Sequence, residues 1–309
     1  MAMLQAQMSA PPRLFNRALL KRRLDRAAAG YGDADFLKRR VALDMVQRLE
    51  PIMRDFPRAV DLSARTGAFA RAVAGSDLAG RIGLLVEADL SEPMLRGRAG
   101  PRLVLDDERL PFAPASLDLV VSTLGLHWTN DVVGALIQIR LALKPDGLLV
   151  AALLGGETLT ELRQSLIAAE VELTGGAGQR VSPFADPADA ASLLQRAGYA
   201  LPVADVDRVC VRYAHPLKLM ADLRQMGETG VLADRHPRAL TRQVLGRACE
   251  IYAQRFADPD GRVRASFEIL TLTGWAPHAS QQQPLKPGSA KTRLADALGT
   301  VEHRVPRER

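Results

Sequence analysis

The chain has 309 residues, of which 47% are hydrophobic and 25% charged, and these proportions are ordinary for a soluble globular protein. They exclude a chain that is disordered throughout, a collagen-like chain and a disulfide scaffold. The most apolar stretch, residues 148–154, is far shorter than the ~20 residues of a membrane-spanning helix. The two cysteines, Cys210 and Cys249, match no metal-ligand spacing and favour a reducing compartment, so we expect a cytoplasmic protein.

The net charge of +6 comes from the N-terminal segment. Residues 1–40 contain nine Lys or Arg and three Asp or Glu, whereas the other 269 residues contain 32 of each. The excess is not spread over the folded body, and we predict no nucleic-acid binding. Between residues 13 and 26 basic residues interleave with leucines, which favours an amphipathic helix with a solvated basic face. Docking of this face to an acidic partner, or peripheral contact with a membrane surface, is the alternative.

The first half of the chain changes from helical to alternating patterns. Residues 1–12 are predicted to be disordered, and 13–50 to form an N-terminal helical segment of two helices broken near 30–32. After that, short apolar runs predict strands near 60–62, 83–86, 103–105, 117–122 and 148–153, with helices at 69–73 and 132–143 between them. Strands that alternate with helices predict a parallel sheet covered on both faces.

The second half has longer helical patterns. We predict helices over 158–173 (opened by the acid Glu157), 187–196, 216–226 and 238–256, and strands over 203–213 and 267–275. The expected organisation is one domain over 51–277, with a cofactor half at 59–153 and a substrate-side half at 154–277. A polar tail follows at 278–309.

Acidic residues follow the first three predicted strands. Asp61 ends the first strand, Asp89 the second, and Asp106 follows the third. In an open α/β sheet, ligands bind outside the carboxyl ends of the strands. An acid after the second strand suits a ribose diol, and one after the third suits an exocyclic amine. We therefore predict a nucleoside pocket here, to which Asp107 and Leu124 also contribute.

This ordered set resembles the class I S-adenosylmethionine-dependent methyltransferases over residues 59–276. The resemblance implies a Rossmann-like α/β fold whose sheet has seven strands, the last antiparallel and formed by 267–275. It implies S-adenosylmethionine as the cofactor, with its methionine part near the loop 61–67. It also places the ribose hydroxyls at Asp89 and the adenine amine at Asp106.

Motifs outside the cofactor strands resemble one subfamily more closely. They are Phe15-Asn16-Arg17, Leu126-His127-Trp128-Thr129-Asn130-Asp131, Gly155-Gly156-Glu157-Thr158-Leu159, Ser182-Pro183-Phe184 and Met226-Gly227-Glu228. This chain is similar to the assembly factors of respiratory complex I, which include a mitochondrial protein-arginine hydroxylase and proteobacterial relatives. The resemblance implies an enzyme that modifies an arginine of a protein substrate, namely a complex I subunit.

The glycine loop departs from the family pattern D-x-G-x-G-x-G. Ser63 and Arg65 replace two of its glycines, and Gly67 remains. Glycine permits positive φ and close approach of the backbone to a ligand. If Ser63 must take a positive φ, the strain costs roughly 1–2 kcal/mol, which weakens cofactor binding without abolishing it. Ser63 and Arg65 could also bind the carboxylate of the cofactor.

Candidate catalytic residues follow the fourth and fifth strands. His127 could act as a general base or stack with Trp128, and the alternative is that both rings simply close the pocket. Glu157 and Arg163 are placed at the same rim, although stabilisation by the helix dipole also explains Glu157. None of the five histidines begins an H-x-D or H-x-E pattern, so we predict no metal site.

Three functions remain open from the sequence. The first is an enzyme of the complex I assembly family that acts on a protein arginine. The second is a methyltransferase for another acceptor, such as the carboxyl of a carrier-bound acyl chain. The third is an assembly chaperone without chemistry, which Ser63 and Arg65 favour and the retained acids oppose.

Overall fold

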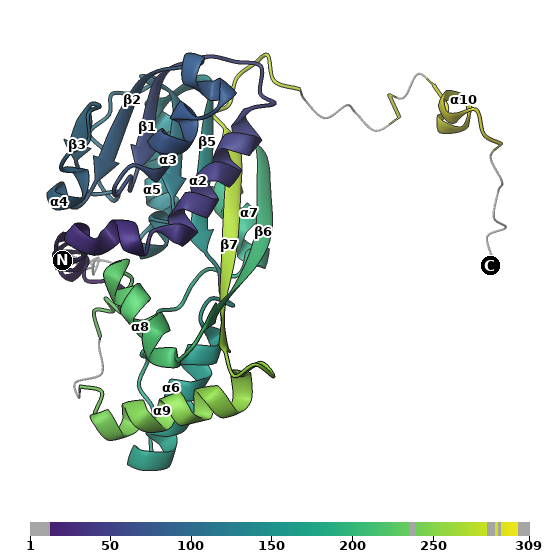
Figure 1. Cartoon of the computed structure of the whole chain (residues 1–309). Helices are drawn as coiled ribbons and strands as arrows, with labels where there is room; N and C mark the ends of the chain where they lie inside the picture. The colour runs from purple at the N-terminus through teal and green to yellow at the C-terminus, as the bar shows by residue number, and fades with distance from the viewer. Residues whose placement is uncertain (1–12, 235–238, 283–287, 290–291, 302–309) are drawn as a thin grey trace, which may run out of the picture. The chain divides into compact units, whose positions relative to one another are not determined.

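A seven-stranded mixed sheet organises residues 1–277 in the computed structural model (Figure 1). The strand order is β3-β2-β1-β4-β5-β7-β6. The strands are β1 (Phe56–Leu62), β2 (Ile82–Asp89), β3 (Arg102–Val104), β4 (Leu117–Thr123), β5 (Leu143–Leu154), β6 (Ala200–Tyr213) and β7 (Val263–Trp275). Strands β1 to β5 pair in parallel, and β7 is antiparallel to both β5 and β6. This confirms the predicted Rossmann-like sheet with an antiparallel last strand.

The structure describes residues 13–234, 239–282, 288–289 and 292–301. The prediction of disorder at 1–12 falls outside these residues. Residues 278–309 form a second unit, in which the described part contains the short helix α10 (Leu294–Leu298). The division of 51–277 into a cofactor half and a substrate-side half stays a prediction.

Helices cover both faces of the sheet, because successive strand residues point to opposite sides. Ala59 of β1 packs in the cluster formed with α2 (Phe36–Leu49) and α3 (Ala68–Ala74). Its neighbour Val60 packs in the cluster formed with α5 (Val132–Ala142) and α7 (Pro187–Arg196). Because helices cover both faces of the central strands, these strands contain nearly continuous apolar runs.

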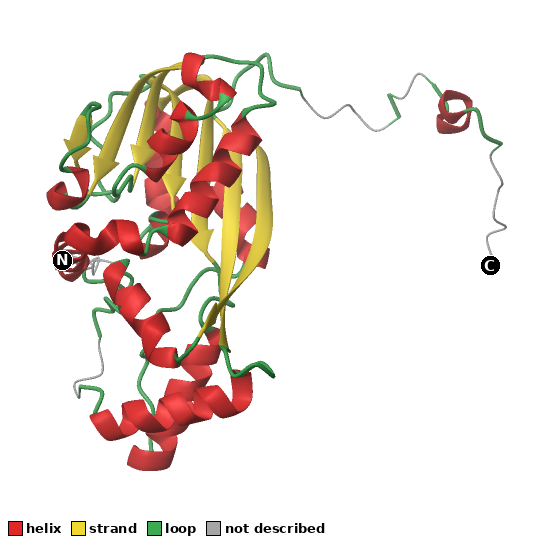
Figure 2. Ribbon diagram, in the orientation of Figure 1, coloured by secondary structure: helices red, strands yellow, loops and turns green. Residues whose placement is uncertain are grey.

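A group of helices lies beyond the carboxyl ends of the parallel strands (Figures 1 and 2). It consists of α6 (Thr160–Thr174), α8 (Pro216–Gln225) and α9 (Arg242–Phe256). Helix α6 begins two residues later than predicted, because Leu159 is left-handed with a φ of 55°. The preceding Thr158 instead exchanges hydrogen bonds with Glu268 of β7.

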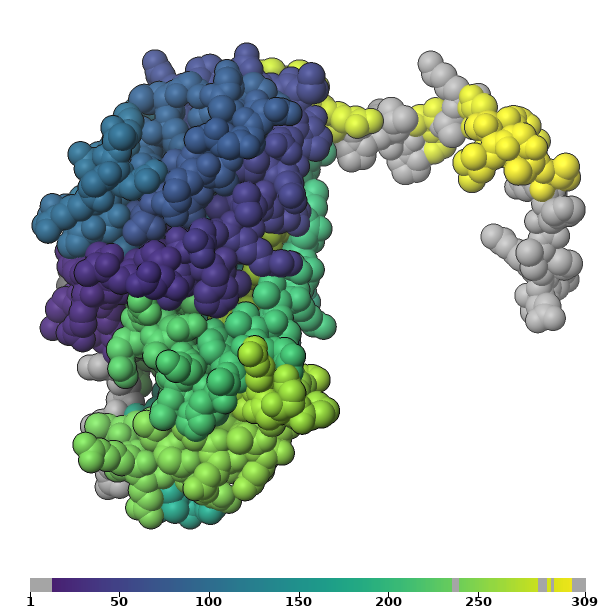
Figure 3. Space-filling view, viewed as in Figure 1, coloured from purple at the N-terminus to yellow at the C-terminus, as the bar shows by residue number. Residues whose placement is uncertain are grey.

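The basic N-terminal segment is part of this fold. Helix α1 (Arg17–Ala27) is capped by the Asn16 side chain and followed by the 3-10 turn η1 (Ala28–Asp33), which confirms the predicted break. Leu20 and Leu24 are buried in a cluster with Trp128. Figure 3 shows this purple segment as a band between the blue strand region and the green α8 region. The alternation of basic and apolar residues therefore reflects an amphipathic helix with a packed face.

Several short elements were not predicted, namely α4 (Glu92–Leu95), η2 (Asp77–Gly80) and η3 (Leu126–Trp128). Strand β7 also starts four residues earlier than predicted, because residues 263–266 continue the pairing with β6, with Val263 and Ala265 buried and Arg264 exposed. Among the described residues, no helix combines the length and apolar character that crossing a membrane requires.

Candidate active site

Acidic side chains gather at the carboxyl edge of β1, β2 and β3. Asp61 and Asp89 are completely buried, and Asp107 is 3% exposed. Hydrogen bonds tie the loop after β1 to this edge, since Ser63 contacts Asp107 and Arg65 contacts Asp89. The carboxyl edge of the sheet therefore brings together the predicted cofactor residues of 61–67, Asp89, Asp106 and Asp107.

The loop after β1 is held in left-handed conformations. Ser63 has a φ of 59° and Arg65 a φ of 53°, next to Gly67 at 77°. Each non-glycine residue in this region costs roughly 1–2 kcal/mol. Gly67 is required for space as well, because a Cβ there would lie 2.2 Å from Oε1 of Glu87. The positive φ expected for Ser63 is confirmed, and Arg65 has one too.

The position of the Ser63 side chain depends on Gly125. The Ser63 hydroxyl donates a hydrogen bond of 3.0 Å to Oδ2 of Asp107. A Cβ on Gly125 would lie only 2.0 Å from Oγ of Ser63. Glycine at 125 thus leaves room for the side chain of the serine that replaces a loop glycine.

The Arg65 side chain is paired with Asp89, the acid to which the resemblance assigns the ribose hydroxyls. Both the backbone N–H and Nη1 of Arg65 donate to Oδ2 of Asp89, at 2.9 and 2.7 Å. The backbone N–H of Ser91 donates to Oδ1 of Asp89 at 2.8 Å. Both side chains of the ion pair are at most 3% exposed. That Arg65 pairs with a cofactor carboxylate stays a prediction, and in this conformation its guanidinium is held by Asp89.

A second arginine engages the acid assigned to the adenine. Arg17 of α1 donates to Oδ1 of Asp106 from Nε at 3.1 Å and from Nη2 at 2.5 Å. Its Nη1 donates to the carbonyl oxygen of Trp128 at 3.2 Å. The N-terminal helix is thereby fastened to the predicted cofactor edge.

Lys38 of α2 is a buried cation at the same edge. Its Nζ donates to the carbonyl oxygens of Ser63, at 2.6 Å, and of Thr123. Burial and the charge of Arg65 lower the pKa of Lys38, and the charge of Asp61 opposes this. Burial raises the pKa of Asp61, while the charge of Lys38 opposes that rise. The two groups therefore share one electrostatic environment.

Buried polar atoms without a hydrogen bond are concentrated around this edge. Within the described residues they include both carboxylate oxygens of Asp61, Oγ1 of Thr66, Oδ1 of Asp107 and Oγ of Ser122. Such groups are rare in folded proteins because each costs free energy when it is left unpaired. A polar ligand at the carboxyl edge would satisfy them. The residues thus fit the nucleoside cofactor implied by the resemblance, on condition that Arg65 leaves Asp89.

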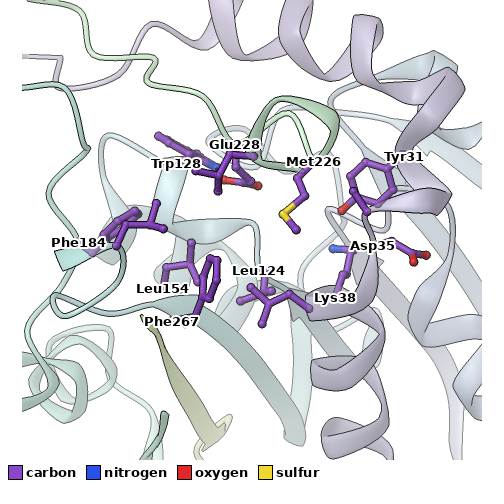
Figure 4. Close-up of a pocket in the computed structure, with 14 residues that line it drawn as sticks. Tyr31, Asp35, Lys38, Leu124, Trp128, Leu154, Phe184, Met226, Glu228 and Phe267 are labelled. Atoms are coloured by element: carbon purple, nitrogen blue, oxygen red, sulfur yellow. The ribbon is translucent and has the colours of Figure 1, made fainter. Parts of the chain in front are cut away.

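Two connected cavities lie beside this edge. The inner one is small, about 30 Å³, and is lined by Tyr31, Lys38, Leu124, Trp128 and Glu228 among others (Figure 4). The outer one measures about 690 Å³ and reaches α6 and α8. Both are lined by Trp128, Leu159, Phe184, Leu223 and Glu228. The two cavities therefore adjoin at these five residues.

The carboxylate of Glu228 contacts the rings of His127 and Trp128 where the two cavities adjoin. Its Oε2 accepts a hydrogen bond from Nε1 of Trp128 at 2.7 Å and lies 3.4 Å from Nε2 of His127. Burial favours a raised pKa for Glu228, but the hydrogen bond and charge of His127 and the charge of Arg65 outweigh it, so its pKa lies below the usual value. Glu228 is therefore a carboxylate at neutral pH.

None of the three predicted catalytic residues lines either of these cavities. The side chain of His127 is 2% exposed and behind the cavity wall, which favours the alternative that it closes the pocket. Glu157 is exposed and lines another cavity beside Arg208. Arg163 donates to the carbonyl oxygen of Gly156 and lines a third cavity. The left-handed Leu159 contributes to this correction, because α6 begins at Thr160 and Glu157 therefore does not open the helix as predicted.

The sequence interpretation missed Lys38, Glu228 and the internal role of Arg17. A signal existed for Lys38, which falls on the same helical face as the buried Val41 and Met45. Glu228 was visible only as part of a motif of the resemblance. In the described part of the chain, no group of three or more His, Cys, Asp or Glu could hold a metal ion.

Comparison with known proteins agrees with this architecture. A family model described as a methyltransferase domain matches residues 60–151. The arginine-hydroxylase NDUFAF5 of Danio rerio is 37% identical over 92% of this chain and 89% of its own length. The human protein of that name is also 37% identical, over 88% of this chain and 79% of its own. The chain belongs to the class I methyltransferase family that includes arginine-hydroxylase NDUFAF5.

Other relatives in this methyltransferase family have a different acceptor in their names. A malonyl-[acyl-carrier protein] O-methyltransferase from Methylovorus is 32% identical over 96% of this chain and 98% of its own length. A solved putative methyltransferase from Bacillus halodurans shares the fold, with a TM-score of 0.52 and 15% identity over 76% of this chain and 99% of its own. The chain is accordingly an enzyme of the S-adenosylmethionine-dependent methyltransferase superfamily.

Proposed function

We propose that this protein is an S-adenosylmethionine-dependent enzyme that modifies an arginine side chain of a protein substrate. The observation that carries the proposal is the pair of cavities beside the carboxyl edge: Trp128 and Glu228 line both cavities, and Lys38, which contacts the loop after β1, lines the inner one. A subunit of respiratory complex I is the substrate that the sequence resemblance implies. A cytoplasmic location belongs to the same proposal.

The cofactor would be held by residues of the carboxyl edge. Asp89 would accept the ribose hydroxyls, Asp106 the adenine amine, and the loop 63–67 would approach the methionine part, with Leu124 at the wall. When bound, S-adenosylmethionine supplies an activated methyl group. In this conformation Arg65 holds Asp89 and Arg17 holds Asp106, so at least the wholly buried Asp89 must be uncovered first.

A deletion strain of the organism that encodes the chain tests this function. We expect its membranes to lose NADH–quinone oxidoreductase activity and one arginine-containing peptide of a complex I subunit to become lighter. A peptide lighter by one oxygen atom indicates hydroxylation, and one lighter by a CH2 group indicates methylation. Asp44→Ala, on an exposed helix face, should complement the strain, and Asp89→Ala should not. An unchanged set of arginine peptides would contradict the proposal.

Two alternatives predict different outcomes in the same strain. A methyltransferase for a carrier-bound carboxyl, as the second group of relatives suggests, predicts biotin or lipid auxotrophy with intact complex I. A non-catalytic assembly chaperone is favoured by the buried Arg65–Asp89 pair, which closes the ribose position. It predicts lost complex I, unmodified arginine peptides in both strains and full complementation by Asp89→Ala.

A further inference from the structure

We infer that Glu228, with the rings of Trp128 and Phe184, forms the receptor for the substrate's guanidinium group. This inference rests on the proposed function, since it names the residues that recognise the arginine. The three side chains line both cavities and therefore lie where the inner and outer cavities adjoin (Figure 4).

The end of α8 fixes the position of Glu228. The helix is followed by Gly227, which is left-handed with a φ of 77°, and the backbone N–H of Glu228 donates to the carbonyl oxygen of Leu223. This is a glycine-dependent helix end in which the chain turns sharply. A Cβ on Gly227 would lie 2.9 Å from Leu24 of α1. The Met-Gly-Glu motif therefore places a carboxylate on the cavity wall.

One oxygen of Glu228 is available to a ligand. Oε2 accepts from Trp128, whereas Oε1 has no hydrogen-bond partner among the residues that the structure describes. The side chain retains 15% exposure and faces the cavities. A carboxylate prefers bidentate or charge-assisted donors, and the guanidinium group supplies both in a planar arrangement.

Among the described residues that line the outer cavity, Glu228 is the one acidic side chain. Lys38 and Asp35 lie at the opposite end of the inner cavity (Figure 4). In the outer cavity, Arg180 is paired with Glu170 at 2.6 Å, and Arg23 donates to the carbonyl oxygen of Gly230. Arg224 also lines the outer cavity. A carboxyl acceptor that reached the junction would face the buried carboxylate of Glu228, and like charges at short range repel strongly in such an environment.

Two aromatic rings complete the receptor. The rings of Trp128 and Phe184 have centroids 6.4 Å apart and an angle of 68° between their planes, so they form a corner. A guanidinium group stacks on aromatic faces and is more weakly hydrated than an ammonium group. The corner and the carboxylate together favour arginine over lysine.

Fluorescence titration of the full chain tests the receptor without any turnover. The chain has two tryptophans, and Trp275→Phe leaves Trp128 as the reporter. Trp275 is at the other end of β7, where Arg54 stacks on it. The probes are N-acetylarginine methylamide and the matching citrulline derivative, which has the same shape and no charge. We expect the arginine probe to bind at least about tenfold more tightly than the citrulline probe.

Glu228→Gln should lower the affinity for the arginine probe about 10- to 100-fold and leave citrulline binding nearly unchanged. Phe184→Leu should lower arginine binding by about two- to fivefold. Glu172→Gln, in an exposed pair with Arg247, is the matched control and should change neither. Glu228→Asp keeps the charge and should keep the preference for arginine.

Equal binding of the two probes by the wild-type chain, or unchanged arginine binding in folded Glu228→Gln, would overturn the inference. Far-UV circular dichroism shows whether each variant is folded. If arginine is preferred but the deletion strain keeps all its arginine modifications, the proposed function fails and the receptor stands. If the modification is lost in that strain but the probes bind equally, the receptor alone fails.

Discussion

Replacing Arg65 by glycine should strengthen cofactor binding. In the present conformation the guanidinium of Arg65 bonds Asp89 at 2.7 Å, and neither group is reachable by a ligand. A hydrogen bond to a charged group contributes about 1.5–3 kcal/mol net, and the cofactor must overcome this contribution to reach Asp89. The apparent affinity of the wild-type chain equals the intrinsic affinity multiplied by the fraction of molecules in which the pair is open.

Removal of the side chain therefore increases the affinity for S-adenosylmethionine by about 10- to 150-fold. Glycine also accepts the φ of 53° at position 65 without the roughly 1–2 kcal/mol of strain that arginine bears there. Arg65→Gln, which keeps a donor and loses the charge, should give a smaller gain.

Isothermal titration calorimetry with S-adenosylmethionine measures this effect directly. Arg48→Ala removes a partly exposed arginine that pairs with Asp44 and Asp205 and serves as the control, with an unchanged dissociation constant. Circular dichroism confirms that each variant is folded. A folded Arg65→Gly protein that binds no tighter than the wild type would refute the reasoning, because it would mean that the pair does not compete with the ligand.

Three further predictions concern stability in urea unfolding. Arg17→Ala should lower the free energy of unfolding by about 1.5–3 kcal/mol, because it removes the contacts with Asp106, whereas the exposed Arg22→Ala should change it by less than about 0.5 kcal/mol. Leu24→Ala, at a completely buried site, should cost about 2–5 kcal/mol, against about 0.5 kcal/mol for the exposed Leu43→Ala. The folded-state pKa of Glu228 lies below its usual value of 4.5. Its ionisation therefore stabilises the fold above pH 4.5, and this contribution disappears as the pH falls through the folded-state pKa. The difference between wild type and Glu228→Gln should shrink accordingly between pH 7 and pH 3.

Each of these expectations has a contradicting result. Equal losses for Arg17→Ala and Arg22→Ala would mean that α1 is not fastened through Asp106. A loss in Leu24→Ala no larger than in Leu43→Ala would mean that α1 does not pack in the described cluster. A wild-type advantage over Glu228→Gln that grows on acidification would reverse the assigned direction of the Glu228 pKa.

The sheet was predictable because its pattern is local. Apolar runs alternate with helical segments, and each of Asp61, Asp89 and Asp106 follows a run within a few residues. The carboxyl edge is a consequence of that order, so its acids could be placed from the chain alone. The length of β7 was underestimated, since its first four residues alternate between buried and more exposed side chains and form no continuous apolar run.

The partners of the acids were not predictable from spacing. Whether Arg65 meets Asp89 depends on a left-handed backbone at residue 65, which a sequence pattern does not specify for arginine. The contact between Trp128 and Glu228 spans 100 residues and requires the fold that brings α8 to the edge. Glu157 was placed at the rim because it follows the fifth strand and opens the predicted helix, but the left-handed Leu159 before α6 moved the helix start.

A crystal structure of the wild-type chain with S-adenosylhomocysteine tests the central claim most directly. The account predicts the ribose hydroxyls on Asp89, the adenine beside Asp106, and the Arg65 side chain displaced from its 2.7 Å contact with Asp89. A ligand bound away from the carboxyl edge, or bound there while the Arg65–Asp89 pair stays closed, would contradict it.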